Sequence, residues 1–170
     1  MQRALHALLK KFRGDERGQV LIEMTLITPL MIALSAGVFE FSNVIYRKLL
    51  IEAGLRDAAR YYARCNEPLF TEAGLAINCG TNAANIALYG TITAGTLRLS
   101  DWSGPVIIAT YTTANNVDPG TGLQDYRSSG DVDTVRLTTS YNYAGTSLLS
   151  YLGIGPITLT ASHEERVVGW

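Results

Sequence analysis

Cys65 and Cys79 are the two cysteines of this 170-residue chain, and their thiols could either form a disulfide or bind a metal. A disulfide between them would close a loop of about 15 residues and add roughly 3 kcal/mol of stability in the chain-entropy model. A metal centre would need more ligands, and the distant His163 is a weak third one. The sequence therefore favours the disulfide, and we expect no metal site and no cofactor.

Four aspartates lie in or beside a turn-rich segment at 114–130: Asp118, Asp125, Asp131 and Asp133. Carboxylate oxygens are the ligands that calcium prefers. Their spacing does not match the EF-hand pattern, so turn formation is the favoured interpretation and an ion in this loop is an open alternative.

His163 is followed by Glu164 and Glu165, a combination that could suggest acid–base chemistry. The chain has no nucleophile-elbow motif, no Walker loop and no dinucleotide-binding glycine motif. We therefore interpret His163 as an edge-strand residue, predict no catalytic residue, and expect the protein not to be an enzyme.

Glu23 stands near the start of a long apolar run at 20–44, whose stretch 24–39 carries no charge. A helix needs about 20 mainly apolar residues to cross a bilayer, so a transmembrane helix is predicted at about 20–45. A carboxylate isolated in hydrocarbon is costly and indicates function. The alternative is that Glu23 snorkels to the cytoplasmic interface.

The charges are unevenly distributed along the chain. Residues 1–18 contain five basic and two acidic residues, a net charge of +3, whereas the remainder has nine against thirteen, a net charge of −4. Basic flanks stay in the cytoplasm, which predicts a single-pass inner-membrane protein with a cytoplasmic N-terminus and a periplasmic C-terminal head. The balanced total charge of −1 argues against nucleic acid as a partner.

Helix-forming residues continue beyond the apolar run, so one helix is predicted from about 20 to 64. Pro29 removes one backbone hydrogen bond and would kink or open this helix. Gly37 and its small neighbours offer a surface where another helix can approach closely. A short basic amphipathic helix is expected at 2–12, on the inner leaflet.

Segments rich in Thr, Val, Ile and Tyr predict strands at 91–99, 106–113, 132–143 and 157–168, with a hairpin turn at Gly104-Pro105 between the first two. The third segment alternates, which predicts one buried face toward a helix: Val135, Leu137, Thr139, Tyr141 and Tyr143. The apolar segment 147–154 would touch the membrane or a neighbour, or fill the local core.

Several motifs together resemble one known family. They are Gly18-Gln19-Val20-Leu21-Ile22-Glu23, Pro29-Leu30, Gly37-Val38-Phe39-Glu40-Phe41, Arg56-Asp57-Ala58-Ala59-Arg60-Tyr61 and the stretch 155–162. The chain resembles the TadE-like minor pilins (pseudopilins) of tight-adherence (Tad/Flp) type IV pili, strongly over 14–64 and more weakly over 132–168.

This resemblance implies an α+β, pilin-like fold in which a long N-terminal transmembrane and stalk helix packs on a small antiparallel sheet head. The expected parts are a cytoplasmic leader at 1–18, the helix at 19–64 and the periplasmic head at 65–170. It also implies that a prepilin peptidase cleaves between Gly18 and Gln19. Gly18 has no Cβ, so the chain can extend there and fit a narrow protease cleft.

Cleavage would leave an α-amino group on Gln19, and the resemblance implies that it pairs with Glu23 of a neighbouring subunit and sets the register of assembly. The implied partners are other pilins and pseudopilins, the prepilin peptidase, the inner-membrane pilus platform and the lipid bilayer. The expected function is that of a minor pilin in pilus assembly. The alternatives are an uncleaved membrane-anchored assembly factor of the same system and a membrane-tethered enzyme or ligand-binding domain.

Overall fold

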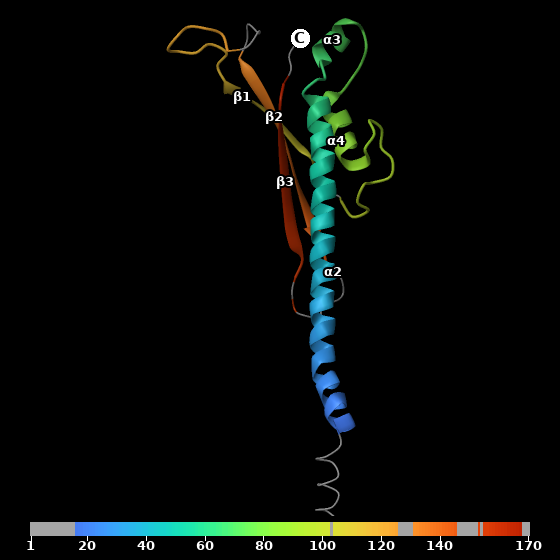
Figure 1. Ribbon diagram of the computed structural model, residues 1–170. Coiled ribbons are helices and arrows are strands. Elements are labelled where there is room, and N and C mark those ends of the chain that lie inside the picture. The colour runs from blue at the N-terminus through green and yellow to red at the C-terminus, as the bar shows by residue number, and fades with distance from the viewer. Residues whose placement is uncertain (1–15, 103, 126–130, 146–152, 154, 168–170) are drawn as a thin grey trace, which may run out of the picture. The chain divides into compact units, whose positions relative to one another are not determined.

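The computed structural model describes residues 16–102, 104–125, 131–145, 153 and 155–167 (Figure 1). The expected amphipathic helix at 2–12 and almost all of the apolar segment 147–154 lie outside the described residues. The chain forms two compact units, 1–42 and 43–170, and helix α2 (Glu16–Tyr62) contributes to both.

The first unit contains the N-terminal half of α2, which is apolar on every side. The exposed fraction of its large apolar side chains ranges from 43% at Ile27 to 76% at Phe39. A helix that is apolar all round is normally found in a membrane or within a bundle of other helices. Of the described residues, Gly18–Tyr62 is the one helix whose length and composition suit a membrane span, and its apolar window is 0% buried.

The second unit is built on the C-terminal half of α2. Two short helices follow it, α3 (Glu67–Glu72) and α4 (Cys79–Tyr89), and then strands β1 (Ile107–Ala114), β2 (Val132–Tyr143) and β3 (Ile157–Arg166). The strands form an antiparallel sheet in the order β1-β2-β3. Figure 1 shows the sheet and α4 alongside this half of α2. The predicted α+β class is confirmed.

The central strand β2 buries one face, as its alternation predicted. Val135 and Leu137 are 0% exposed, and Tyr141 and Tyr143 are 2% exposed, while Arg136 between them is exposed. The polar side chains of the other face lie toward solvent, as expected for a sheet covered on one side.

The core joins β2 to α2, to α4 and to the loop after α4. Gly54 of α2 lies so close to α4 that a Cβ there would be 2.5 Å from the carbonyl oxygen of Ala87. Small residues on the two helices allow this approach, because no side chain separates the backbones. The buried cluster comprises Ile51, Leu55, Ala58, Ala59, Ala63, Ala83, Ala87, Leu99, Trp102, Val135, Leu137, Tyr141 and Tyr143.

The prediction of a strand at 91–99 is wrong, because this segment is an irregular connection after α4. It buries Leu99 and then Trp102 in the core, and the backbone N–H of Arg98 donates to Leu88 of α4 at 2.8 Å. Packing on the helices therefore overrides the local β propensity.

The predicted hairpin turn at Gly104-Pro105 is consequently wrong as well. Gly104 instead passes β2 so closely that a Cβ would be 2.0 Å from the carbonyl oxygen of Ser140. Thr139 Oγ1 donates to the carbonyl of Pro105 at 3.0 Å, which anchors the same crossing.

Neither α3 nor α4 was predicted from the sequence. Each begins after an asparagine whose side chain accepts a hydrogen bond from a first-turn N–H: Asn66 from Leu69 at 3.1 Å and Asn78 from Thr81 at 2.7 Å. Asparagine is a preferred N-cap residue, so this local signal could have identified both helices.

Candidate assembly site on the N-terminal helix

The predicted cleavage junction lies at the start of the described part of α2. Gly18 and Gln19 are both helical there. Gly18 has nothing within 4 Å of the position of a Cβ, and Gln19 is exposed. Glycine is a weak helix former, so the helix can unwind at Gly18 at lower cost than at most other residues.

Glu23 lies one turn after Gln19 on the same side of the helix, because the two residues are four positions apart. This spacing corresponds to a rise of about 6 Å along the axis. Glu23 is exposed and is the one charged residue between 18 and 39. An acid with this position needs either water or a cation from another molecule.

Two hydroxyl groups in the same stretch donate hydrogen bonds to backbone carbonyls of the helix itself. Thr25 donates to the carbonyl of Leu21 at 2.7 Å, and Thr28 donates to the carbonyl of Met24 at 2.6 Å. Both side chains can therefore face an apolar medium without an unpaired donor. Among the described residues, no such hydrogen bond satisfies the Glu23 carboxylate, which distinguishes it from Thr25 and Thr28.

Pro29 and Gly37 both lie inside α2. Pro29 has no N–H, so the carbonyl of Thr25 loses its usual helical donor there. A Cβ on Gly37 would meet nothing within 4 Å, which leaves this side of the helix open to a close neighbour.

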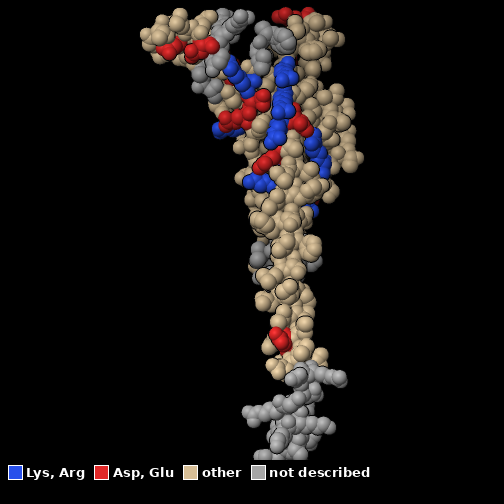
Figure 2. Space-filling model, in the orientation of Figure 1, with Lys and Arg blue, Asp and Glu red and all other residues tan. Residues whose placement is uncertain are grey.

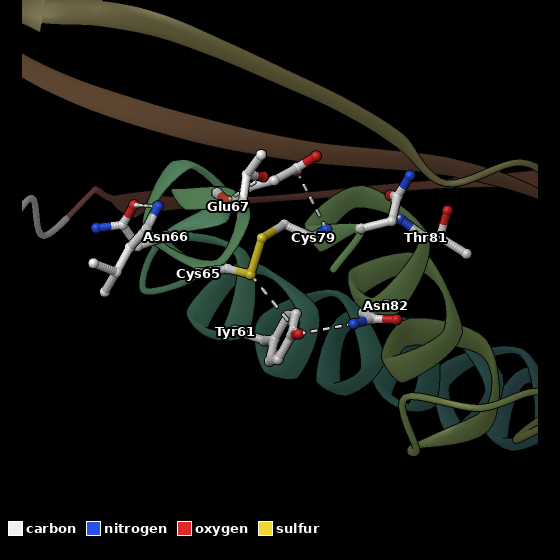
Figure 3. The surroundings of a disulfide bond; sticks show 10 residues. Tyr61, Cys65, Asn66, Glu67, Cys79, Thr81 and Asn82 are labelled. Carbon is white, nitrogen blue, oxygen red and sulfur yellow. Dashed lines mark hydrogen bonds between the residues drawn. A yellow bond between two sulfur atoms is a disulfide. The ribbon is translucent and has the colours of Figure 1, made fainter. Parts of the chain in front are cut away.

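Cys65 and Cys79 form a disulfide, the pairing that we favoured from the sequence (Figure 3). It connects the end of α2 to the start of α4 and encloses α3. Two hydrogen bonds support this junction: Asn82 Nδ2 donates to the Tyr61 hydroxyl at 3.0 Å, and the N–H of Cys79 donates to Glu67 Oε2 at 3.4 Å. The bridge therefore fixes α3 against the helix ends.

A polar network that the sequence did not reveal joins α2 to the head. Arg47 donates to both carboxylate oxygens of Asp101 at 2.8 and 2.7 Å and also to the hydroxyl of Tyr141, which in turn donates to Asp101. The guanidinium lies 5.2 Å from the ring centre of Tyr143, and Asn43 donates to the Tyr143 hydroxyl at 3.0 Å. The Arg47 side chain is therefore bound within the head.

Burial in this network, together with the adjacent carboxylate of Asp101, raises the pKa of Tyr141 to about 12. Burial alone would raise the pKa of Asp101, but hydrogen bonds from Tyr141 and Arg47 outweigh it and hold that pKa below its ordinary value. Asp101 is therefore charged and Tyr141 neutral at physiological pH, which is the protonation state that these hydrogen bonds require.

The aspartate-rich segment forms a small ordered loop in its described part. Asp118 Oδ1 accepts the backbone N–H groups of Gly120 and Thr121 at 2.7 and 3.0 Å, the turn-forming role that the sequence favoured. These bonds lower the pKa of Asp118. No three His, Cys, Asp or Glu side chains within the described ranges gather as metal ligands.

His163 lies on β3 opposite Leu137, with its Nε2 atom 3.5 Å from Glu165 Oε2. The Glu164 side chain instead pairs with Arg136 on the neighbouring strand. His163 and the described part of the aspartate loop are therefore separate features of the fold.

The family model described as TadE-like protein matches residues 18–60 of the chain. No curated protein and no solved structure matches the chain. The matched segment contains the glycine junction, Glu23, Pro29 and Gly37, all of them on α2. It indicates involvement in a Tad pilus system and association with its components. Residues 18–60, all of them on α2, are therefore similar to the TadE-like family, in agreement with the resemblance seen in the sequence.

Proposed function

We propose that this protein is a minor pilin, or pseudopilin, that takes part in assembling a tight-adherence pilus through its N-terminal helix. The observation that carries this proposal is a helix whose apolar side chains are exposed, with a glycine junction at the start of its described part and a lone acid one turn after Gln19. The TadE-like match over the same residues supports it.

Before assembly, α2 anchors the chain in the inner membrane at about 20–45. The basic residues that precede it keep the N-terminus in the cytoplasm, so the head is periplasmic. The Cys65–Cys79 disulfide supports this orientation, because structural disulfides persist in oxidising compartments.

A prepilin peptidase then cleaves between Gly18 and Gln19. Local unwinding of α2 at Gly18, a weak helix former, would let this peptide bond reach the protease. The new ammonium on Gln19 pairs with Glu23 of an adjacent subunit, which neutralises an acid that hydrocarbon would otherwise disfavour. Gly37 and its small neighbours supply a surface for helix packing in the fibre.

In this proposal the head selects partners and performs no catalysis. Its titratable side chains serve folding: Arg47, Asp101 and Tyr141 hold α2 to β2, and Arg136 pairs with Glu164 across the outer face of the sheet. The protein acts through binding of other pilins and of the inner-membrane pilus platform.

The N-terminal residue of the protein tests the processing step. We expect mass spectrometry of the chain purified from membranes to find Gln19 first when the peptidase is present and Met1 first when it is deleted. Gly18→Leu should abolish cleavage, because a large side chain cannot enter a cleft that accepts glycine. Gly37→Leu serves as the matched control and should be cleaved normally.

The competing function is that of a membrane-anchored assembly factor that is never cleaved. An intact Met1 terminus in cells with an active peptidase would support that alternative and contradict the pilin proposal.

A further inference from the structure

Three arginines form an exposed stripe at the C-terminal end of α2, two on the helix and one in the turn that follows it. Arg56, Arg60 and Arg64 follow one another at intervals of four residues and are all exposed. Residues four apart lie on the same side of a helix. Figure 2 shows Lys and Arg side chains gathered along this half of α2.

These arginines differ from the other arginines that face the sheet and the loops. Arg98 pairs with Asp57 at 2.7 Å, and Arg136 pairs with Glu164. Within the described ranges, neither Arg60 nor Arg64 forms an ion pair. Their charges are therefore available to another molecule.

Arg60 and Arg64 also border a groove of about 420 Å³, whose other lining residues are Tyr61, Cys65, Phe70 and Ile77. The Cys65–Cys79 disulfide holds one wall, and the hydrogen bond from Asn82 fixes the Tyr61 ring in place. Phe70 is 37% exposed, so an aromatic surface lies beside the two cations. Such a groove suits a segment that combines acidic and apolar side chains.

The chain itself carries a segment of this chemistry, the loop at 116–125. An isolated bridge pairs Val117 with Gln124, and the N–H of Asp125 donates to the carbonyl of Asn116 at 2.9 Å. Its apolar side chains point outward: Leu123 is 69% exposed and Val117 is 46% exposed. The loop therefore presents two apolar side chains to solvent.

Two carboxylates, Asp118 and Asp125, accompany these apolar residues. Neither forms an ion pair with any residue that the structure describes. The loop thus carries two negative charges next to two apolar side chains, and the groove carries two positive charges next to an aromatic and an aliphatic one. The two surfaces are complementary, and they do not meet within one chain.

We propose that the groove of one copy of this protein receives the 116–125 loop of a second copy. Because the two surfaces are different patches of the same chain, the contact is heterologous and can repeat from copy to copy. It goes beyond the pilin function proposed above: it uses only the second unit, 43–170, and does not depend on cleavage at Gly18, so either proposal can fail alone.

Photo-cross-linking of the full chain in detergent micelles tests this contact. The probe p-benzoyl-phenylalanine replaces Phe70, and equal amounts of ¹⁴N- and ¹⁵N-labelled protein are mixed before irradiation, reduction and trypsin digestion. We expect the peptide with residue 70 to be joined to the peptide 99–127 in mixed-isotope pairs. The same probe at Ile92, which is 54% exposed and outside the groove, should give no such product. Cross-links that are only intramolecular, or that join a different peptide, would overturn the proposal.

Charge exchange provides a second, independent test. Arg60→Glu with Arg64→Glu, or Asp125→Arg alone, should each lower the yield of the mixed cross-link at least fivefold. A mixture in which only the Arg60→Glu, Arg64→Glu protein carries the probe should restore it, because the loop of the Asp125→Arg protein is then attracted to the exchanged groove. Arg56→Glu is the matched control, on the same stripe but outside the groove, and should retain most of the yield. If the paired variants do not restore the product, the assignment of the two surfaces is wrong, and the Asp125 variant keeps this test valid if the double variant does not fold.

Discussion

At the scale of single residues, the structure separates two kinds of acid. Asp101 has its charge satisfied by Arg47 and Tyr141 inside the head. Glu23 is exposed on an apolar helix where no described cation pairs with it. The first acid contributes to folding, whereas the second needs a partner from another subunit in the function that we propose.

Glu23→Ala should therefore leave processing intact and reduce incorporation. We expect the ratio of protein in sheared pili to protein in membranes to fall about tenfold, measured by quantitative immunoblotting, because the partner ammonium of Gln19 loses its counter-charge. Thr25→Ala is a matched control in the same helix, since the Thr25 hydroxyl bonds only to the backbone of its own helix. A Glu23→Ala protein that enters pili at the normal ratio would remove this role.

Tyr141 gives a prediction for the pH dependence of stability. Its pKa in the folded protein is about 12, against an ordinary value of 10.0. The unfolded chain therefore loses this proton first as the pH rises. The contribution of Tyr141 to stability is complete below about pH 10 and is lost progressively up to about pH 12. This difference in the pKa of Tyr141 corresponds to a contribution of about 2 to 3 kcal/mol at most to the free energy of unfolding.

The measurement is the free energy of unfolding of the full chain in detergent micelles, followed by the near-ultraviolet circular dichroism of Trp102 and its neighbours. Tyr141→Phe removes the titrating group and should give a visibly shallower decline between pH 10 and pH 12. Equal slopes for the two proteins would show that Tyr141 does not control the alkaline transition.

At the scale of elements, the close crossing of α2 and α4 determines how the head packs. Gly54→Ala should lower the stability of the head by about 1 to 3 kcal/mol, because the added methyl group would lie 2.5 Å from the Ala87 carbonyl oxygen. Alanine is the better helix former, so propensity alone predicts the opposite sign. Gly37→Ala, with open space around it, is the matched control and should leave the thermal midpoint of the head unchanged.

The sequence was sufficient for the elements whose pattern is long and local. The apolar length of α2 and the alternation of β2 predicted both elements and the buried face of the strand. The segment 91–99 was misassigned because Leu99 and the following Trp102 pack on helices, a tertiary effect that β propensity does not contain. The short helices α3 and α4 depend on asparagine caps and on close contacts of alanines, which a periodicity analysis overlooks.

The candidate site shows the same division. Gly18, Gln19 and Glu23 are neighbours in the sequence, so the position of Glu23 one turn after Gln19 follows from helix geometry alone. The Arg47 network joins residues that are 54 and 94 positions apart, and no local pattern predicts such contacts. The groove beside Arg60 and Arg64 likewise depends on the disulfide that brings the α3 region back to α2.

At the scale of the whole molecule, the chain combines an apolar helix, of a kind found in membranes and helix bundles, with a head that buries its own apolar core. The head has a defined buried cluster and an ordered sheet, whereas the apolar side chains at the N-terminal end of α2 are covered by nothing in the described chain. Burial of apolar surface is the dominant favourable term in association, so that stretch of helix must find lipid or other helices.

The most direct test of this account is the N-terminal residue and location of the protein in cells that make pili. Sheared pili and membranes would be separated, and the protein in each fraction would be analysed by immunogold labelling and by mass spectrometry of its N-terminus. The account predicts that the pilus fraction contains this protein beginning at Gln19. A protein confined to the membrane fraction and beginning at Met1 would contradict it.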